Sequence, residues 1–319
     1  MASLLGQLAA GNYSFTTPTP LTHQRVLARS RVTAARTLRD IFGWNLPFTA
    51  ADIRPELLAS MKTAGALRED RGVFFSTVRV SSLEQDLFLH SAFPTTQDNA
   101  VFFGPDTYRF ARFIRQELQI WVRGTSAKGR RKKPVRILDV GCGSGAGGIV
   151  AARCLEAAGI PFTVTMNDIN PLALKYTAAN AAFVSVAVEL ALGDALSSVS
   201  GDFDLVLSNP PYLDDPAARA YRHGGARLGR ALGVRIATEA LARLSPQGQL
   251  LLYTGVAIVD GADPFIAELQ PHLDPARFEA RYSEIDPDVF GEELERPVYA
   301  HADRIAAVGL TAKRVGEKV

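Results

Sequence analysis

Residues 137–148 read Ile137-Leu-Asp-Val-Gly-Cys-Gly-Ser-Gly-Ala-Gly-Gly148, and this stretch decides the fold. The apolar run that ends at Val140 predicts a buried strand, the glycines permit a tight turn, and a helical pattern begins at Ala146. Backbone N–H groups at the start of a helix have no partner inside the helix, so they can face an anionic or polar ligand. The sequence therefore predicts a ligand site where this strand ends.

Strand and helix patterns alternate on the C-terminal side of this turn. Such alternation predicts a parallel, doubly wound α/β sheet. Two more strands are expected near the end of the chain with only an acidic loop between them, so at least one of the two should run antiparallel. The expected strands are 135–140, 161–166, 186–190, 203–208, 249–253, 277–282 and 298–308, and the expected helices are 146–158, 171–182, 231–244 and 264–269.

The first hundred residues have a different rhythm. We expect a loose lead-in over 1–20, a helix from an N-cap at Thr22 through Phe42 to a stop at Gly43, and a helical stretch over 50–67 broken at Pro55. Strands over 73–80 and 86–90 should then form a hairpin. Helices followed by a hairpin predict a small α+β module, an order found in winged-helix domains.

A domain boundary is expected at residues 103/104. Residues 1–103 would form the N-terminal α+β domain and help to choose a substrate, and residues 104–319 would form the doubly wound domain. The second domain should open with a helix capped by Asp106, followed by a basic linker over 128–134.

Composition excludes several classes of protein. Hydrophobic residues make up 47% of the 319 residues and charged residues 21%, which rules out wholesale disorder. The 35 Lys and Arg residues against 33 Asp and Glu residues argue against a global polyanion binder. No apolar run is long enough for a membrane span, no export signal is visible, and two cysteines cannot form a disulfide framework. We therefore expect a cytoplasmic protein, and no pattern indicates a metal site.

The ligand of the glycine turn has two interpretations. Gly143, Gly145 and Gly148 satisfy the dinucleotide-binding pattern G-x-G-x-x-G, which would indicate an NAD-linked oxidoreductase. Asp139 opposes this interpretation, because a carboxylate two residues before the first glycine repels a phosphate and attracts a cation. A purely structural turn without a ligand is the third possibility.

The pattern Asp139-x-Gly141-x-Gly143-x-Gly145 resembles the first motif of S-adenosyl-L-methionine (SAM) dependent methyltransferases. The resemblance runs from about residue 104 to the end and implies a Rossmann-like, seven-stranded methyltransferase sheet with SAM as cofactor. In that family an acid after the second strand binds the ribose hydroxyls, a role a carboxylate suits well. An acid after the third strand, at the place of Asp194 in this sequence, accepts a hydrogen bond from the adenine amino group. The cofactor-binding residues implied here are Asp139, Gly141, Cys142, Gly143, Gly145, Asp168, Ile169, Asp194, Ala195 and Asn209.

The fourth strand ends in the tetrapeptide Asn209-Pro210-Pro211-Tyr212. It resembles the signature of enzymes that methylate a planar amide or exocyclic amine nitrogen. Such a nitrogen is a poor nucleophile, so its N–H groups must be drawn toward acceptors. Asn209 offers a side-chain oxygen and Pro210 a backbone carbonyl that prolines hold in a fixed direction. Tyr212 would supply a face for stacking the acceptor. We expect these four residues to be catalytic.

The segments 168–174 and 209–212 together resemble the HemK-type methyltransferases, whose members modify a release-factor glutamine. Val101-Phe-Phe-Gly-Pro-Asp-Thr107 occupies the place of that family's Pro/Asp/Thr segment, although Gly104 stands where bacterial members carry arginine. Gly224, Gly225 and Gly229 resemble the Gly-Gly loop of archaeal and eukaryotic relatives. The expected acceptor is therefore a macromolecule: most simply a protein glutamine of a release factor or ribosomal protein, alternatively an adenine or guanine amine in RNA or DNA.

Other residues allow a functional and a structural interpretation. Two groups of basic residues, one before the first strand and one after the tetrapeptide, could form a rim that binds nucleic acid or an acidic protein. Alternatively, they form an ordinary solvated surface. His223 and the two cysteines are expected to be structural or incidental. Phe102, Phe103 and Tyr108 either cover the site or pack between the two modules. A binding adaptor that has lost catalysis is a further hypothesis. The basic residues in question are Arg130, Arg131, Lys132, Lys133, Arg219, Arg222, Arg227 and Arg230, and the cysteines are Cys142 and Cys154.

Overall fold

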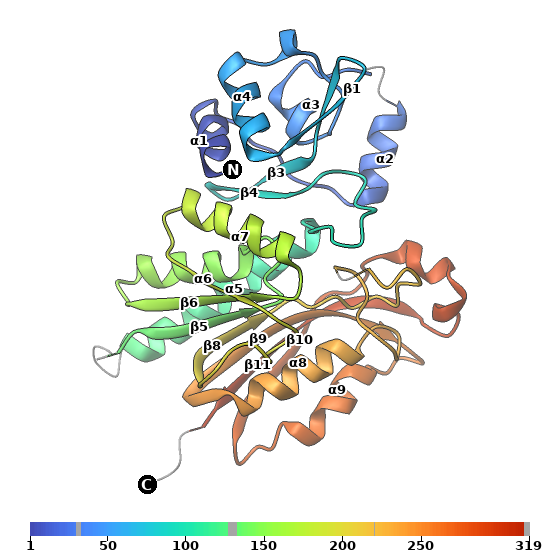
Figure 1. Ribbon diagram of the computed structural model, residues 1–319. Coiled ribbons are helices and arrows are strands. Elements are labelled where there is room, and N and C mark those ends of the chain that lie inside the picture. Colours follow the sequence, from blue (N-terminus) through green and yellow to red (C-terminus); the bar gives the residue numbers. More distant parts are fainter. Residues whose placement is uncertain (30–32, 127–132, 220, 316–319) are drawn as a thin grey trace.

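A seven-stranded, mostly parallel sheet carries the C-terminal two thirds of the chain (Figure 1). The computed structural model describes residues 1–29, 33–126, 133–219 and 221–315. The strand order is β10-β11-β9-β8-β5-β6-β7, and β11 pairs antiparallel with both β9 and β10. The predicted α/β, Rossmann-like sheet with an antiparallel strand near its end is confirmed. The strands are β5 (Val135–Val140), β6 (Phe162–Asp168), β7 (Glu189–Leu192), β8 (Phe203–Ser208), β9 (Leu244–Ile258), β10 (Phe278–Asp286) and β11 (Arg304–Arg314).

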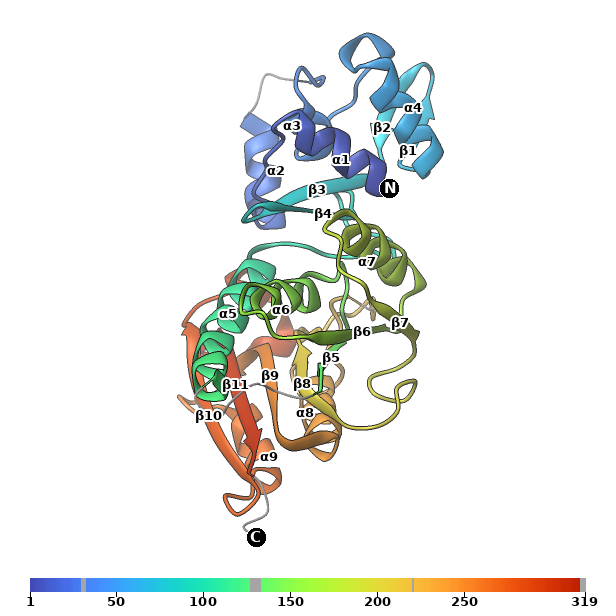
Figure 2. The same ribbon diagram turned by 90° about the vertical axis from the view of Figure 1, so that its left-hand side faces the viewer.

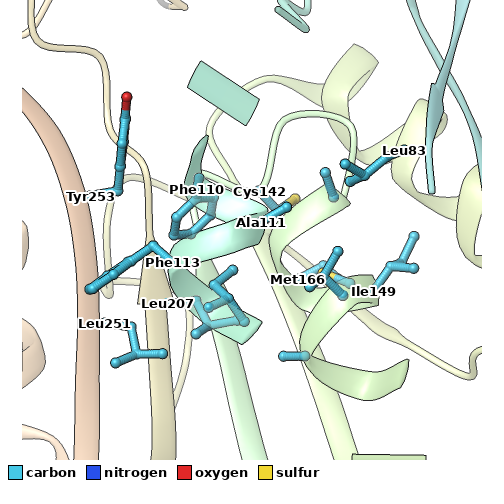
Figure 3. Packing of buried hydrophobic residues seen from close by; sticks show 14 of the residues in the cluster. Leu83, Phe110, Ala111, Phe113, Cys142, Ile149, Met166, Leu207, Leu251 and Tyr253 are labelled. Carbon is cyan, nitrogen blue, oxygen red and sulfur yellow. The ribbon is translucent and has the colours of Figure 1, made fainter. Parts of the chain in front are cut away.

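Alternating side chains of β5 divide the core into two layers. Ile137 packs with the helices on one face, whereas Leu138 and Val140 pack with those on the other, because successive strand residues point to opposite faces. Figure 3 shows the first layer, in which Phe113 of α5 and Leu207 of β8 belong to the same buried cluster. Helices α5 (Pro105–Ser126), α6 (Ala146–Ala157) and α7 (Pro171–Phe183) belong to the first face, and α8 (Ala231–Ala242) and α9 (Pro264–Leu269) to the second.

The N-terminal region is α+β, as predicted, but its helices differ from the prediction. Residues 2–10 form α1 rather than a loose lead-in, because Leu4, Leu5 and Leu8 are fully buried beside α4 and α7. The expected single helix over 22–42 is wrong. It is two helices, α2 and α3, and the second begins at the capping box of Thr37 with Asp40. The elements are α1 (Ala2–Ala10), α2 (Pro20–Arg29), α3 (Leu38–Phe42), α4 (Pro55–Ala64), β1 (Leu67–Asp70), β2 (Val73–Ser76), β3 (Val78–Leu83) and β4 (Asp86–Ser91).

Several boundaries elsewhere also shift. The strand expected over 73–80 is divided into β2, which pairs with β1, and β3, which pairs with β4. The strand expected over 298–308 begins only at Arg304, because residues 297–299 form a 3-10 turn that starts with Pro297. Asp106 does not cap α5 from outside. It lies inside the first helical turn and is buried.

Helix α7 joins the N-terminal region to the sheet. Figure 2 shows α7 directly below β3 and β4, between them and the sheet. Asn180 of α7 is completely buried; its amide accepts the N–H of Leu89 in β4 at 2.8 Å and donates to the Leu89 carbonyl at 3.1 Å. The same amide donates to the carbonyl of Ser144 in the glycine turn at 2.8 Å. One buried side chain therefore links the N-terminal hairpin to the predicted ligand site.

Candidate active site

A cavity opens at the carboxyl ends of β5, β6 and β8. Strand β5 pairs with β6 on one side and with β8 on the other, so the chain reverses its direction across the sheet at β5. Crevices at such switch points are where open α/β sheets bind ligands. The predicted site residues on the cavity wall are Asp139, Gly141, Cys142, Gly143, Asp168, Ile169, Asp194, Ala195, Asn209, Pro210, Pro211 and Tyr212.

Gly145 is the predicted site residue that does not line the cavity. It lies behind the turn with φ +79°, and a Cβ there would meet the Thr177 side chain at 3.0 Å. Its glycine is therefore explained by the geometry of the turn and by packing on α7.

Asp139 lies beneath the glycine turn. Its Oδ2 accepts the N–H of Gly148 at 2.7 Å, and the side chain is 1% exposed. A Cβ at Gly147 would come within 2.9 Å of that carboxylate, so only glycine lets α6 approach this closely. Burial, with a smaller contribution from the charge of Asp168, raises the pKa of Asp139 to about 7.

Asp168 ends β6 on the cavity wall. One oxygen accepts the N–H of Gly143 and the other that of Asn170, both at 2.8 Å. Burial raises the pKa of Asp168 above the ordinary value despite these bonds. Each carboxylate oxygen has more than one lone pair, so both can also accept a ligand hydroxyl.

The chemistry of this end of the cavity fits SAM. Gly141 has φ +68°, and no atom lies within 4 Å of where its Cβ would be, so bare backbone faces open space. Two buried carboxylates beside that backbone favour a cation and accept hydroxyls, whereas they would repel the phosphates of a dinucleotide. Asp139 and Asp168 are thus suited to a nucleoside that carries a positive charge.

Asp194 is more exposed than the other two acids. It forms an ion pair with Arg235 of α8, whose Nη1 lies 2.8 Å from Oδ2. The hydrogen bonds from Arg235 hold the pKa of Asp194 below its ordinary value. Its predicted contact with an adenine amino group remains a prediction.

The tetrapeptide follows β8, the neighbour of β5 in the sheet, and also lines the cavity. Ser208 anchors its start by donating to the carbonyl of Val140 in β5 at 2.9 Å. In the part of the chain that the structure describes, the side chain of Asn209 has no hydrogen-bond partner, so its oxygen is available to a ligand. Tyr212 is only 8% exposed, and its hydroxyl donates to Asp106 at 2.6 Å. Its expected stacking on an acceptor remains a prediction.

The cavity wall also contains residues to which the sequence analysis gave another role or none. Asp106 and Phe290 both line the cavity next to Tyr212. Phe102, expected either to cover the site or to pack between modules, lines the cavity and stacks on Tyr221 with 6.3 Å between ring centroids. Phe103, in contrast, is buried against His90. The aromatic cluster 102–108 therefore has both roles.

The arginines after the tetrapeptide are neutralised within the chain. Arg219 pairs with Asp215 at 2.6 Å, Arg222 pairs with Glu293, and Arg227 and Arg230 share Glu268. Arg130, Arg131 and Lys132 lie outside the described residues. The interpretation of this segment as a free basic rim is therefore weakened.

His223 and the cysteines have structural surroundings. Nδ1 of His223 accepts the N–H of Asp215 at 3.1 Å, which fixes the loop. Cys142 is buried beside Thr177, and burial raises the pKa of its thiol. Cys154 is half-buried in α6. Among the described residues, no group of three His, Cys, Asp or Glu side chains is placed to hold a metal ion.

No helix within the described ranges is both long and apolar enough to cross a membrane.

The chain is similar to known methyltransferases over part of its length. A release factor glutamine methyltransferase of Deinococcus radiodurans is 35% identical over 158 residues, 50% of this chain and 48% of that protein. One from Lactococcus lactis is 28% identical over 173 residues, 51% of this chain and 60% of that protein. The ribosomal RNA small subunit methyltransferase C of Serratia proteamaculans is 34% identical over 79 residues, 25% of this chain and 22% of that protein.

The chain spans about half the length of the first of these relatives. The family described as methyltransferase small domain matches residues 128–257. This range contains the glycine turn, both buried acids and the whole tetrapeptide. The chain is therefore similar to the methyltransferase small domain family over the segment that carries most of the predicted site residues.

Proposed function

We propose that the chain is a SAM-dependent N-methyltransferase that acts on the side-chain amide of a protein glutamine. One observation carries this proposal: Asn209–Tyr212 and the carboxylates Asp139 and Asp168 face the same cavity. A donor held by the acids would therefore lie beside hydrogen-bond acceptors suited to a planar nitrogen.

The roles of the residues follow from their chemistry. Bound SAM supplies an electrophilic methyl group on a positively charged sulfur. The Asn209 oxygen and the Pro210 carbonyl accept hydrogen bonds from the two N–H groups of the acceptor and so direct its nitrogen lone pair toward the donor methyl. Orientation and placed dipoles supply the rate, and no strong base is needed because the methylated amide loses its proton readily.

A protein acceptor is favoured over nucleic acid by the charges near the tetrapeptide. Arg219, Arg222, Arg227 and Arg230 are each paired with a carboxylate, so they offer little free charge to phosphates. The relatives from Deinococcus radiodurans and Lactococcus lactis are named as release factor glutamine methyltransferases. A partner in translation would also place the enzyme in the cytoplasm.

Methylation of a base amine in RNA is the second candidate. It is supported by the similarity to ribosomal RNA small subunit methyltransferase C. A paired base would have to be flipped out of its stack to reach the tetrapeptide.

Residues 1–103 are proposed to help choose the acceptor. Pro20, Thr95 and Phe102 lie on the cavity wall, and the hydroxyl of Tyr221 donates to the Thr95 carbonyl at 2.5 Å. The N-terminal region and the segment after the tetrapeptide therefore meet at the cavity, where they can contact an acceptor together.

Transfer of tritium-labelled methyl from SAM into a cell lysate, with and without ribonuclease, tests the proposal. We expect label in the protein fraction that ribonuclease does not remove. Label lost with ribonuclease would favour the RNA acceptor, and no label in either fraction would contradict methyltransferase activity.

A further inference from the structure

Tyr212 is fixed by contacts on several sides. An edge-to-face contact joins its ring to Phe290, with 5.8 Å between centroids. A Cβ at Gly255 of β9 would come within 2.1 Å of the Tyr212 ring, so only glycine leaves room for it. Phe290 itself has φ +54°, a conformation that is unfavourable for a bulky residue. The fold thus accepts a strained residue beside this ring.

The hydroxyl of Tyr212 is bonded to a residue that lies 106 positions earlier in the sequence. Oδ2 of Asp106, in the first turn of α5, accepts it at 2.6 Å. Oδ1 accepts the hydroxyl of Tyr253 in β9 at 2.7 Å and also faces Arg109 at 3.2 Å. Arg109 in turn pairs with Asp286 at 2.8 Å. Asp106 is 5% exposed and lines the cavity, so it connects α5, β9 and the tetrapeptide at one buried point.

A stiff stretch of backbone connects the Tyr212 ring to the acceptor groups of the tetrapeptide. Two prolines connect Asn209 to Tyr212, and proline leaves the backbone little rotational freedom. The backbone of Tyr212 is also enclosed: a Cβ at Gly229 would lie 2.1 Å from its carbonyl oxygen, and one at Gly224 would lie 2.7 Å from its Cα. A shift of the Tyr212 ring would therefore be transmitted through the prolines to the Pro210 carbonyl and the Asn209 side chain.

We propose that Asp106 is a positioning residue for methyl transfer, which fixes the Pro210 carbonyl and Asn209 by holding the Tyr212 hydroxyl. The inference rests on the proposed function of the tetrapeptide. Asp106 acts by accepting hydrogen bonds at a set place, not by removing a proton from the acceptor.

Substitutions at both ends of the bond test this role. The measured quantity is the rate of tritium transfer from SAM into lysate at saturating SAM, with the SAM dissociation constant measured separately. Asp106→Ala and Tyr212→Phe should each lower the rate about 30-fold, and the double variant should be no slower than either single one, because both remove the same bond. SAM affinity should stay within about twofold of wild type, because the donor contacts lie elsewhere.

The conservative variant separates position from charge. Asp106→Asn keeps the shape of the side chain and one acceptor oxygen, which can serve the Tyr212 hydroxyl while the amide nitrogen donates to the Tyr253 hydroxyl and Arg109 keeps its pair with Asp286, so the rate should stay within about threefold of wild type. A rate for Asp106→Asn as low as that of Asp106→Ala would overturn the inference, because it would mean that the charge of Asp106 is what matters.

Tyr282→Phe is the matched control. Its hydroxyl donates to Asp263 at 2.5 Å in a tyrosine–aspartate bond of the same kind, and neither residue lines the cavity. We expect wild-type methyl transfer from this variant. If Asp106→Ala fails to fold, Tyr212→Phe decides: a rate within about twofold of wild type would overturn the inference. If the wild-type chain transfers no methyl group, the proposed function itself is contradicted.

Discussion

The two ends of the cavity are built in different ways. At the end with Asp139 and Asp168, carboxylates are held by backbone N–H groups from a turn within one strand–turn–helix–strand unit. At the other end, Tyr212 is held by side chains 106 residues earlier and 78 residues later in sequence, at Asp106 and Phe290.

The two ends should respond differently to substitution. The first end depends on local backbone geometry, so a single carboxylate can be replaced without displacing its neighbours. The second end depends on packing between distant elements, so a change far from the tetrapeptide in sequence can displace it.

Asn209→Ala should abolish the function of the second end and leave that of the first intact. Removing one placed hydrogen-bond acceptor should lower methyl transfer by about 100-fold or more, while SAM still binds. Transfer of tritium and calorimetric titration with SAM measure the two effects. Asn99→Ala, an exposed asparagine on the segment next to the cavity, serves as the control and should turn over normally. Wild-type turnover by Asn209→Ala would refute the assigned role.

Gly255→Ala should displace the Tyr212 ring without removing any polar group. The added methyl group would overlap the Tyr212 ring, so we expect methyl transfer to fall about tenfold or more with SAM affinity retained. Gly6→Ala, where a Cβ meets no atom within 4 Å, is the control and should stabilise α1 by about 0.5–1 kcal/mol. Equal transfer rates for the two variants would argue against the packing account.

The first end should respond to pH through Asp139. Because the pKa of this carboxyl is raised to about 7, it is largely neutral at pH 6 and ionised at pH 8. Only the ionised form attracts a cation, so SAM affinity should rise by up to about tenfold between these pH values. Calorimetry at pH 6, 7 and 8 measures the rise, and Asp139→Asn should abolish it. A flat response of the wild-type chain would contradict the electrostatic role.

Folding stability should show the opposite dependence on pH. Between about pH 4 and pH 7 the folded chain keeps a proton on Asp139 that the unfolded chain has lost, so stability falls as pH rises through this window. Denaturant titrations of wild type and Asp139→Asn over this range should show a decline in the first that is smaller in the second. The same slope in both would assign the decline to other groups.

Arg227→Ala should have the smallest effect. Arg227 is exposed and paired with Glu268, so its loss should change stability by less than about 1 kcal/mol and leave methyl transfer within about twofold. Initial rates in low and high salt provide the measurement. A large loss of rate, with a steep salt dependence in the wild type, would favour a nucleic-acid acceptor.

The first end of the cavity could be predicted because its residues lie within one strand–turn–helix–strand unit. The strand ending at Val140 and the helix starting at Ala146 have the predicted limits, and the acid at the end of β6 lies beside the glycine turn. Glycines with positive φ and acids after strands follow local rules of backbone geometry, which the sequence displays directly.

The second end could be predicted only in part. The tetrapeptide can be recognised in the sequence. Asp106, in contrast, has the sequence pattern of a helix cap, and no local pattern indicates that Phe290 lines the cavity. Their positions depend on how β9, α5 and the loop before β11 pack in three dimensions. The prediction of the N-terminal helices was wrong for a related reason. Helix α1 is stabilised by its contacts with α4 and α7, which the local sequence does not reveal.

A calorimetric titration of the purified chain with SAM, repeated in the presence of NAD, tests the central claim most directly. The account predicts saturable binding of SAM that Asp168→Ala abolishes and Asn209→Ala preserves, with no displacement of SAM by NAD. No heat of binding at millimolar SAM, or displacement of SAM by NAD, would contradict it.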